Sequence, residues 1–227
     1  MILASHQPNF FPYMGYFYKI AKSDYFVFSD EVAFSNSKSG DMHNYNYIKG
    51  PQGKTRITLP VSKPANGFPI AEVRICYDRK QVNGVLAAIR QYYGKAPFFE
   101  EAFGDILGAF DYGHEFLADF NFHVIVGICV KFGIMKPTLA RSWGYPGVKD
   151  ERLVNMCRRH RADTYLSGSG AAAYHDVSFF TDNGIGLVYS DYVPPVYPQR
   201  YGEFIPNLSV LDWIFNMGYT LPEGWLK

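Results

Sequence analysis

A short segment near the N-terminus, with two prolines between an apolar run and a helical pattern, places the strongest limit on how this chain folds. The apolar run 1–4 is long enough for a strand, and residues 16–22 have the apolar spacing of a helix. Pro8 and Pro12 prevent either element from continuing through the segment. We therefore expect a stiff loop at the carboxyl end of a first strand, the usual place for a ligand site in an α/β protein. Its polar residues are Ser5, His6, Gln7 and Asn9.

Strands alternate with helices at both ends of the chain. This order predicts a single three-layer α/β domain over residues 1–227 with a mostly parallel sheet. Three stretches with helical apolar spacing fill residues 81–133, and we expect them to form a helical insertion that packs on one face of the sheet. Beyond the first strand, strands are expected at 25–29, 71–77, 137–142, 163–167 and 186–189, a hairpin at 45–61, and helices at 150–161, 171–175 and after 209.

Two later segments are expected to reach the same edge of the sheet as His6. Asp30 follows a predicted parallel strand and is the best candidate for a catalytic carboxylate, although it could equally begin a turn. The segment 167–170 joins a strand to a short helix through a glycine-rich turn, whose N–H groups could approach an anion. A plain tight turn is the alternative, because neither the phosphate-binding loop motif nor the dinucleotide fingerprint is present.

The residue types exclude several classes of protein. A net charge of +1 does not favour a nucleic-acid backbone or an anionic membrane as partner. Three separated cysteines indicate reduced thiols in a cytoplasmic protein, and we expect neither a signal peptide nor a membrane span. His114, Asp119 and His123 lack a further acid or thiol at ligand spacing, so no metal site is expected. The sequence does not indicate a cofactor, and a homodimer is compatible with it.

No Ser-His-Asp order and no nucleophile elbow is recognisable in the sequence. Cys76, Cys129 and Cys157 lie in apolar or helical settings, which does not favour a reactive thiolate. Ser209 and Asp212 match a capping box for the last helix, so we interpret both as structural. Catalysis is therefore expected to use His6 as acid or base, assisted by dipoles of Gln7, Asn9 and backbone N–H groups.

The sequence resembles the WbqC-like protein family over nearly its whole length. The residues HQPNFFPYMGYFYK at 6–19 and FVFSDEVAF at 26–34 match that family's opening pattern, and 197–212 matches its closing pattern of YxQ followed by FxPxLSxLD. Tyr165, Ser167, Gly168 and Tyr174 match a further segment. Residues 43–49 depart from the pattern, with tyrosines in place of arginines, which weakens an anion-binding role for this loop.

The resemblance implies a pathway and a reaction class. Family members occur in gene clusters for bacterial surface polysaccharides, including O-antigen, so it implies a transferase that moves an aminoacyl or acyl group to an amino-sugar. Nucleotide-sugars and acyl donors are the expected small-molecule substrates. Nucleotidyl or adenylyl transfer and a non-catalytic binding protein of the glycan machinery stay open as alternatives, and a nucleotidyltransferase-like topology would suit the former. The expected catalytic residues are His6 and Asp30, and the expected substrate-binding residues are Gln7, Asn9, Tyr13, Lys19, Asn46, Ser167, Gly168, Gly170, Tyr174, Tyr197 and Gln199.

Overall fold

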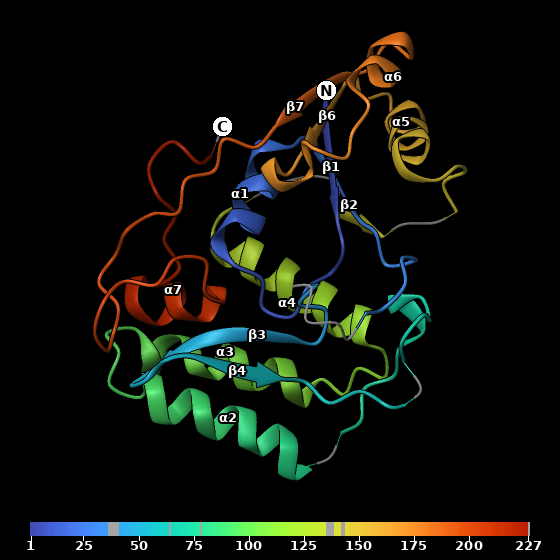
Figure 1. Cartoon of the computed structure of the whole chain (residues 1–227). Helices are drawn as coiled ribbons and strands as arrows, with labels where there is room; N and C mark the ends of the chain where they lie inside the picture. The colour runs from blue at the N-terminus through green and yellow to red at the C-terminus, as the bar shows by residue number, and fades with distance from the viewer. Residues whose placement is uncertain (36–40, 64, 78, 135–138, 142–143, 227) are drawn as a thin grey trace.

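A five-stranded parallel sheet lies in the upper part of the molecule in the view of Figure 1. The structure is a computed structural model, and it describes residues 1–35, 41–63, 65–77, 79–134, 139–141 and 144–226. Every neighbouring pair of strands is parallel, and helices cover the sheet on both faces, which confirms the predicted three-layer α/β fold. The strand order is β5 (Leu139–Arg141), β2 (Tyr25–Phe28), β1 (Ile2–His6), β6 (Thr164–Ser167) and β7 (Gly186–Tyr189).

The two faces of the sheet bury two separate sets of apolar side chains, because successive residues of a strand point to opposite faces. Leu3 of β1 and Tyr165 of β6 are in register and belong to one cluster, which α5 and α6 cover. Ala4 and Leu166 follow them and belong to a larger cluster on the other face, with α1, α4 and α7. These helices are α1 (Met14–Lys22), α4 (Leu117–Lys131), α5 (Lys149–Arg159), α6 (Val177–Asp182) and α7 (Val210–Met217).

An antiparallel hairpin lies between helices below the sheet (Figure 1). It consists of β3 (Tyr45–Gly50) and β4 (Gly53–Thr58), and it packs against α2 (Arg79–Tyr93) and α7. The predicted helical stretch becomes α2, α3 (Phe99–Asp111) and α4. The last of these helices packs on the sheet, where the rings of Phe28 and Phe122 meet edge to face with centroids 5.0 Å apart.

Two predicted elements are wrong. No strand forms at 71–77; a 3₁₀ turn, η1 (Ile70–Glu72), follows Pro69, and Ile75 makes only an isolated bridge to Val61, because no continuous partner strand lies beside it. No α-helix forms at 171–175; the chain there makes the 3₁₀ turn η2 (Ser169–Ala171). Five residues are too few for a cooperative helix. The helix begins later, where the Asp176 carboxylate accepts from the first free N–H groups of α6.

The proline-bounded loop after β1 owes its shape to residues far away in the sequence. Phe11 has a φ of 40°, in the left-handed region that a bulky side chain rarely adopts. The Asn46 Nδ2 group donates to the carbonyls of Phe10 and Phe11 at 3.1 and 2.7 Å, and the Ser209 hydroxyl also donates to the Phe11 carbonyl, at 2.9 Å. Asn46 is fully buried, so these bonds are shielded from water. The hairpin and the start of α7 therefore fix the loop conformation together.

Replacement of Asn46 by alanine is expected to lower the free energy of unfolding by about 2–4 kcal/mol, because two buried carbonyls lose a donor. Urea denaturation followed by circular dichroism measures this change. Asn155→Ala is the matched control, since its amide donates to Pro146 at an exposed position, and we expect a loss below about 1 kcal/mol there. Equal losses in the two variants would contradict a role of Asn46 in holding the loop.

Candidate functional site

A cavity opens at the carboxyl edge of the sheet, where the strand order reverses between β1 and β6. If the five strands are counted along the chain, their order in space is 3-2-1-4-5. Doubly wound sheets bind ligands outside the carboxyl ends of the strands at such a switch point. The cavity has a volume of about 470 Å³. It brings together His6, Gln7, Tyr13, Lys19, Ser167, Gly168 and Gly170 of the predicted site residues, and adds His175.

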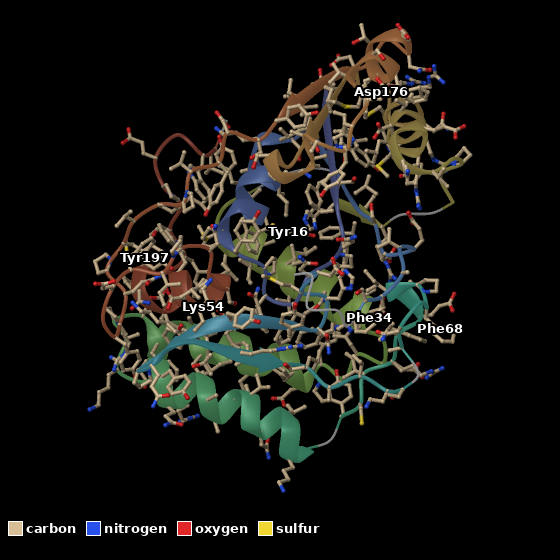
Figure 2. All side chains as sticks on the ribbon, viewed as in Figure 1. Tyr16, Phe34, Lys54, Phe68, Asp176 and Tyr197 are labelled. Atoms are coloured by element: carbon tan, nitrogen blue, oxygen red, sulfur yellow. The ribbon has the colours of Figure 1, made fainter. Side chains whose placement is uncertain are left out.

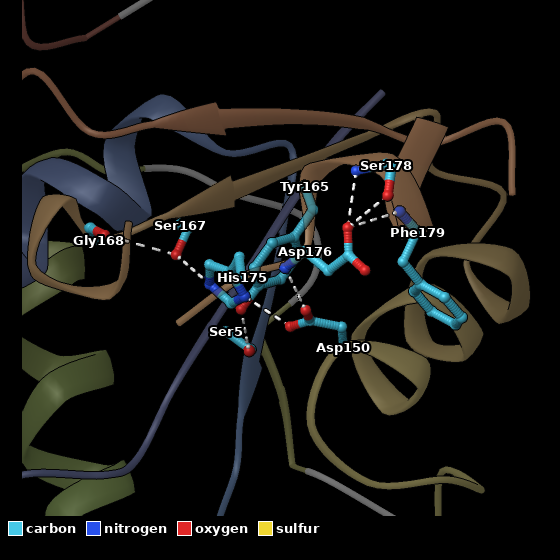
Figure 3. A network of polar contacts seen from close by, with 9 residues as sticks. All are labelled: Ser5, Asp150, Tyr165, Ser167, Gly168, His175, Asp176, Ser178 and Phe179. Carbon is cyan, nitrogen blue, oxygen red and sulfur yellow. Dashed lines mark hydrogen bonds and ion pairs between the residues drawn. The ribbon is translucent and has the colours of Figure 1, made fainter. Parts of the chain in front are cut away.

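Three side chains at this cavity form a chain of hydrogen bonds (Figure 3). The Ser167 hydroxyl lies 2.8 Å from Nε2 of His175, and Nδ1 of His175 lies 2.6 Å from Oδ1 of Asp150. The second oxygen of Asp150 accepts from the backbone N–H of Asp176 at 2.8 Å. A carboxylate oxygen accepts, so Nδ1 of His175 donates to Asp150, and in the neutral ring Nε2 then accepts from the Ser167 hydroxyl. We call Ser167, His175 and Asp150 the relay.

Each member of the relay is positioned by a different element. Ser167 ends β6, where its carbonyl accepts from the N–H of Ser190 at 2.8 Å. Asp150 lies in the first turn of α5, and His175 lies in the segment between η2 and α6. The side chains of His175 and Asp150 are 10% and 15% exposed, so the relay is largely shielded from water. This arrangement can take a proton from Ser167 and make its oxygen a nucleophile.

Backbone donors line the cavity beside the serine. The turn after β6 contributes Gly168, Ser169 and Gly170 to the lining. Within the described part of the chain, the N–H groups of Ser169 and Gly170 have no acceptor, as is usual in the first turn of any helix. Unpaired backbone N–H groups of this kind are donors that can bind an anion.

His6 is held in its neutral form. Its Nδ1 atom donates to the Gln7 carbonyl at 3.1 Å, and its ring meets that of Tyr16 edge to face with centroids 4.9 Å apart. Burial, followed by the positive charge of Lys19, lowers the pKa of His6 from 6.5 to about 4. At neutral pH this side chain is a weak base that accepts through Nε2. It is therefore suited to binding and orienting a ligand.

The sequence comparisons cover almost the full length of the chain. The model of the WbqC-like protein family matches residues 7–222. The chain belongs to the WbqC-like protein family. A relative named "Uncharacterized protein Rv1507c", from Mycobacterium tuberculosis (strain ATCC 25618 / H37Rv), is 31% identical over 221 residues, which cover 96% of this chain and 94% of that protein. No solved structure shows a significant match.

The closing motif of this WbqC-like protein, residues 197–212, does not line the cavity. Tyr197 is near α7, whereas Asp176 is at the opposite end of the molecule (Figure 2). The Tyr197 hydroxyl donates to Asp212 at 2.6 Å, and Gln199 accepts from the buried ammonium of Lys49 at 3.1 Å. Lys49 also donates to the carbonyl of Glu203 at 2.5 Å. This network ties the C-terminal segment to the hairpin.

Several other predicted site residues of the WbqC-like protein also lie outside the cavity. Asp30 is at the expected edge of the sheet, but it is buried and its carboxylate accepts from Nε of Arg141 at 2.5 Å. Asn46 holds the loop, as described above. Tyr174 is 83% exposed. Asn9 is buried, and its Oδ1 atom finds no donor among the described residues.

The sequence analysis missed two relay members, His175 and Asp150. Ser167 stood out because a glycine-rich turn follows a strand, but its partners follow no local spacing: Asp150 precedes it by 17 residues and His175 follows by 8. Only the fold places them together.

Two further features concern the whole described chain. The described residues contain no group of three or more His, Cys, Asp and Glu side chains placed to hold a metal ion. No described helix combines the length and apolar character needed to cross a bilayer.

Proposed function

We propose that this WbqC-like protein transfers an acyl or aminoacyl group to an amino-sugar in the assembly of a bacterial surface polysaccharide. The observation that supports this proposal is the relay, since its chain of hydrogen bonds has the order found in serine hydrolases and serine acyltransferases. Family membership supports the proposed pathway, and the relay supports the proposed reaction. The cavity at the switch point provides room for the reacting groups.

The proposed reaction has two steps. In the first, the Ser167 oxygen attacks the acyl carbonyl, and its proton passes to Nε2 of His175 and then to the leaving group of the donor. The product is an ester between Ser167 and the acyl group. In the second, an amine of the sugar attacks that ester, its proton passes to His175, and the proton returns to the Ser167 oxygen as the C–O bond breaks. Asp150 holds the imidazole in the required tautomer and stabilises its cationic form.

The roles of the two histidines follow from their surroundings. His175 has a carboxylate partner at 2.6 Å and a serine at 2.8 Å, which makes it the better base. His6 has a lowered pKa and no carboxylate partner among the described residues, so we assign it to ligand binding. Asp30 is assigned to positioning Arg141 at the same edge of the sheet.

A fluorophosphonate probe tests whether Ser167 is activated. We expect one equivalent of label on the peptide that contains Ser167, because such probes react with serines whose proton a neighbouring base accepts. Labelling should fall about 100-fold or more in His175→Ala. Ser169→Ala is the matched control, since it removes a hydroxyl from the same cavity lining without altering the relay. Mass spectrometry of proteolytic peptides measures the site and the extent.

The identity of the acyl acceptor can be tested with the acylated enzyme. After reaction with p-nitrophenyl acetate, the ester on Ser167 should discharge faster to UDP-glucosamine than to water, with an amide of the sugar as product. Absence of label on Ser167, or equal label in wild type and His175→Ala, would exclude the serine mechanism. Label on Ser167 with discharge to water alone would instead favour a hydrolase.

A further inference from the structure

Lys19 brings a positive charge to the cavity without a neutralising partner. The side chain belongs to α1, is 7% exposed and lines the cavity. Its ammonium donates to the Ser5 carbonyl at 2.8 Å, and no carboxylate lies within 4.0 Å of it in the described chain. Because the cation is poorly solvated at this buried position, the pKa of Lys19 is lowered from 10.5 to about 8. Two of its three N–H groups are left for a ligand.

The rest of the lining adds no negative charge to the cavity and contributes backbone hydrogen-bond donors. Among the described residues that line the cavity, none is an aspartate or a glutamate. The carboxylate of Asp150 lies behind His175 and is already engaged by that ring and by the N–H of Asp176. The wall formed after β6 offers the unpaired N–H groups of Ser169 and Gly170. A cation and N–H donors that line the same cavity favour an anion as its ligand.

We propose that the cavity binds a phosphoryl group of the substrate between Lys19 and the backbone of Ser169 and Gly170. A phosphoryl group has enough oxygens to accept from both sets of donors at once, and lysine is a common partner for it as a point charge. A cavity of about 470 Å³ is larger than a phosphate alone, so the group belongs to a larger molecule. The proposal names a substrate class for the transferase proposed above and rests on that function, but binding can be measured without turnover.

Calorimetric titration with pyrophosphate, UDP and coenzyme A tests the site and separates the sources of the phosphoryl group. UDP represents a nucleotide-sugar, and coenzyme A represents a thioester acyl donor. We expect Lys19→Met to weaken binding about 10- to 100-fold, the size of one charge-assisted hydrogen bond. Lys22→Met is the matched control, since it removes a charge from the same helix at a position where the ammonium donates to Gly224 outside the cavity.

Proton uptake gives a second readout of Lys19. At pH 9 the free protein holds this amine mostly neutral, because its pKa is about 8. A bound phosphoryl group favours the ammonium, so binding at pH 9 should take up a proton. Titrations in buffers with different ionisation enthalpies measure that proton. We expect uptake in wild type and in Lys22→Met, and none in Lys19→Met.

A backbone variant tests the N–H donors and does not depend on the folding of Lys19→Met. Ser169→Pro removes one N–H group. The preceding Gly168 has φ −69° and ψ 146°, which suits a following proline. We expect weaker binding in Ser169→Pro and unchanged binding in Ser169→Ala, which lacks the hydroxyl but keeps the N–H.

A further variant distinguishes binding of the phosphoryl group from the proposed transfer reaction. Ser167→Ala should keep the binding of the phosphorylated probe and lose labelling by the fluorophosphonate. If the probe still binds but the serine mechanism fails its test, the anion site is supported and the proposed transferase function is contradicted. Failure of all three probes to bind wild type at millimolar concentration would overturn the anion site, as would equal losses in Lys19→Met and Lys22→Met.

Discussion

Replacement of His175 by alanine is expected to lower kcat for acyl transfer by about 10⁴-fold or more, with a loss of unfolding free energy of at most about 2 kcal/mol. The large kinetic effect follows because no other base among the described residues lies within hydrogen-bond reach of Ser167. Stopped-flow release of p-nitrophenol from p-nitrophenyl acetate measures the first step. His160→Ala is the matched control, since that ring also contacts a hydroxyl, of Tyr145 at 2.6 Å, but lies outside the cavity.

The double variant gives the sharper result. If Ser167, His175 and Asp150 act as a unit, Ser167→Ala combined with His175→Ala should be no slower than either single variant. If the rate losses of the two single variants multiply in the double variant, the two residues act independently. A variant His6→Asn that stops the reaction, together with an active His175→Ala, would transfer the role of base to His6 and contradict the assignment made above.

Replacement of Lys19 by methionine is expected to raise the free energy of unfolding at pH 7 by about 2–3 kcal/mol, because a buried cation without a counterion is removed. The lowering of its pKa from 10.5 to about 8 corresponds to about 3 kcal/mol. Loss of the hydrogen bond to the Ser5 carbonyl offsets part of this gain. Most single substitutions destabilise a protein, so a gain at a buried position would be informative.

The pH dependence of this effect has a definite sign. Below pH 8 the amine is protonated in both the folded and the unfolded state, and the full cost of burying the cation is present. Between pH 8 and 10.5 the folded protein releases the proton while the unfolded chain keeps it, so wild type gains stability relative to Lys19→Met. Urea denaturation at pH 7 and pH 10, with Lys22→Met as reference, measures the difference. A gain that does not shrink at pH 10 would contradict a buried ammonium.

The sequence was informative for features that depend on residues close together in the chain. The loop between Pro8 and Pro12 and the turn after Ser167 were recognised because proline, glycine and apolar runs act locally. The three-layer architecture is confirmed, as are the predicted strands other than the one at 71–77. His175 was missed because it was placed at the end of a predicted helix over 171–175, although five residues are too few for a cooperative helix.

Other assignments depend on contacts that no sequence pattern reveals. Tyr197 and Gln199 belong to a motif of the family, and such a motif does not tell whether a residue contacts a ligand or another part of the chain. In the structure their partners are Asp212 and Lys49. Asp30 follows a strand as expected, but Arg141, more than a hundred residues later, turns its carboxylate into an ion pair.

The position of β1 in the sheet has a consequence for the order of folding. This strand comes first in the chain and lies at the centre of the sheet, with β2 beginning at Tyr25 on one side and β6 beginning at Thr164 on the other. During synthesis one edge of β1 therefore stays unpaired until most of the chain has left the ribosome, and an open edge invites pairing with other chains. The loop after β1 reaches its final conformation later still, because it needs the hydrogen bond from the Ser209 hydroxyl to the Phe11 carbonyl. Fragments that end before residue 164 should therefore aggregate when expressed alone, whereas the full chain should fold slowly for its size, as long-range pairing requires.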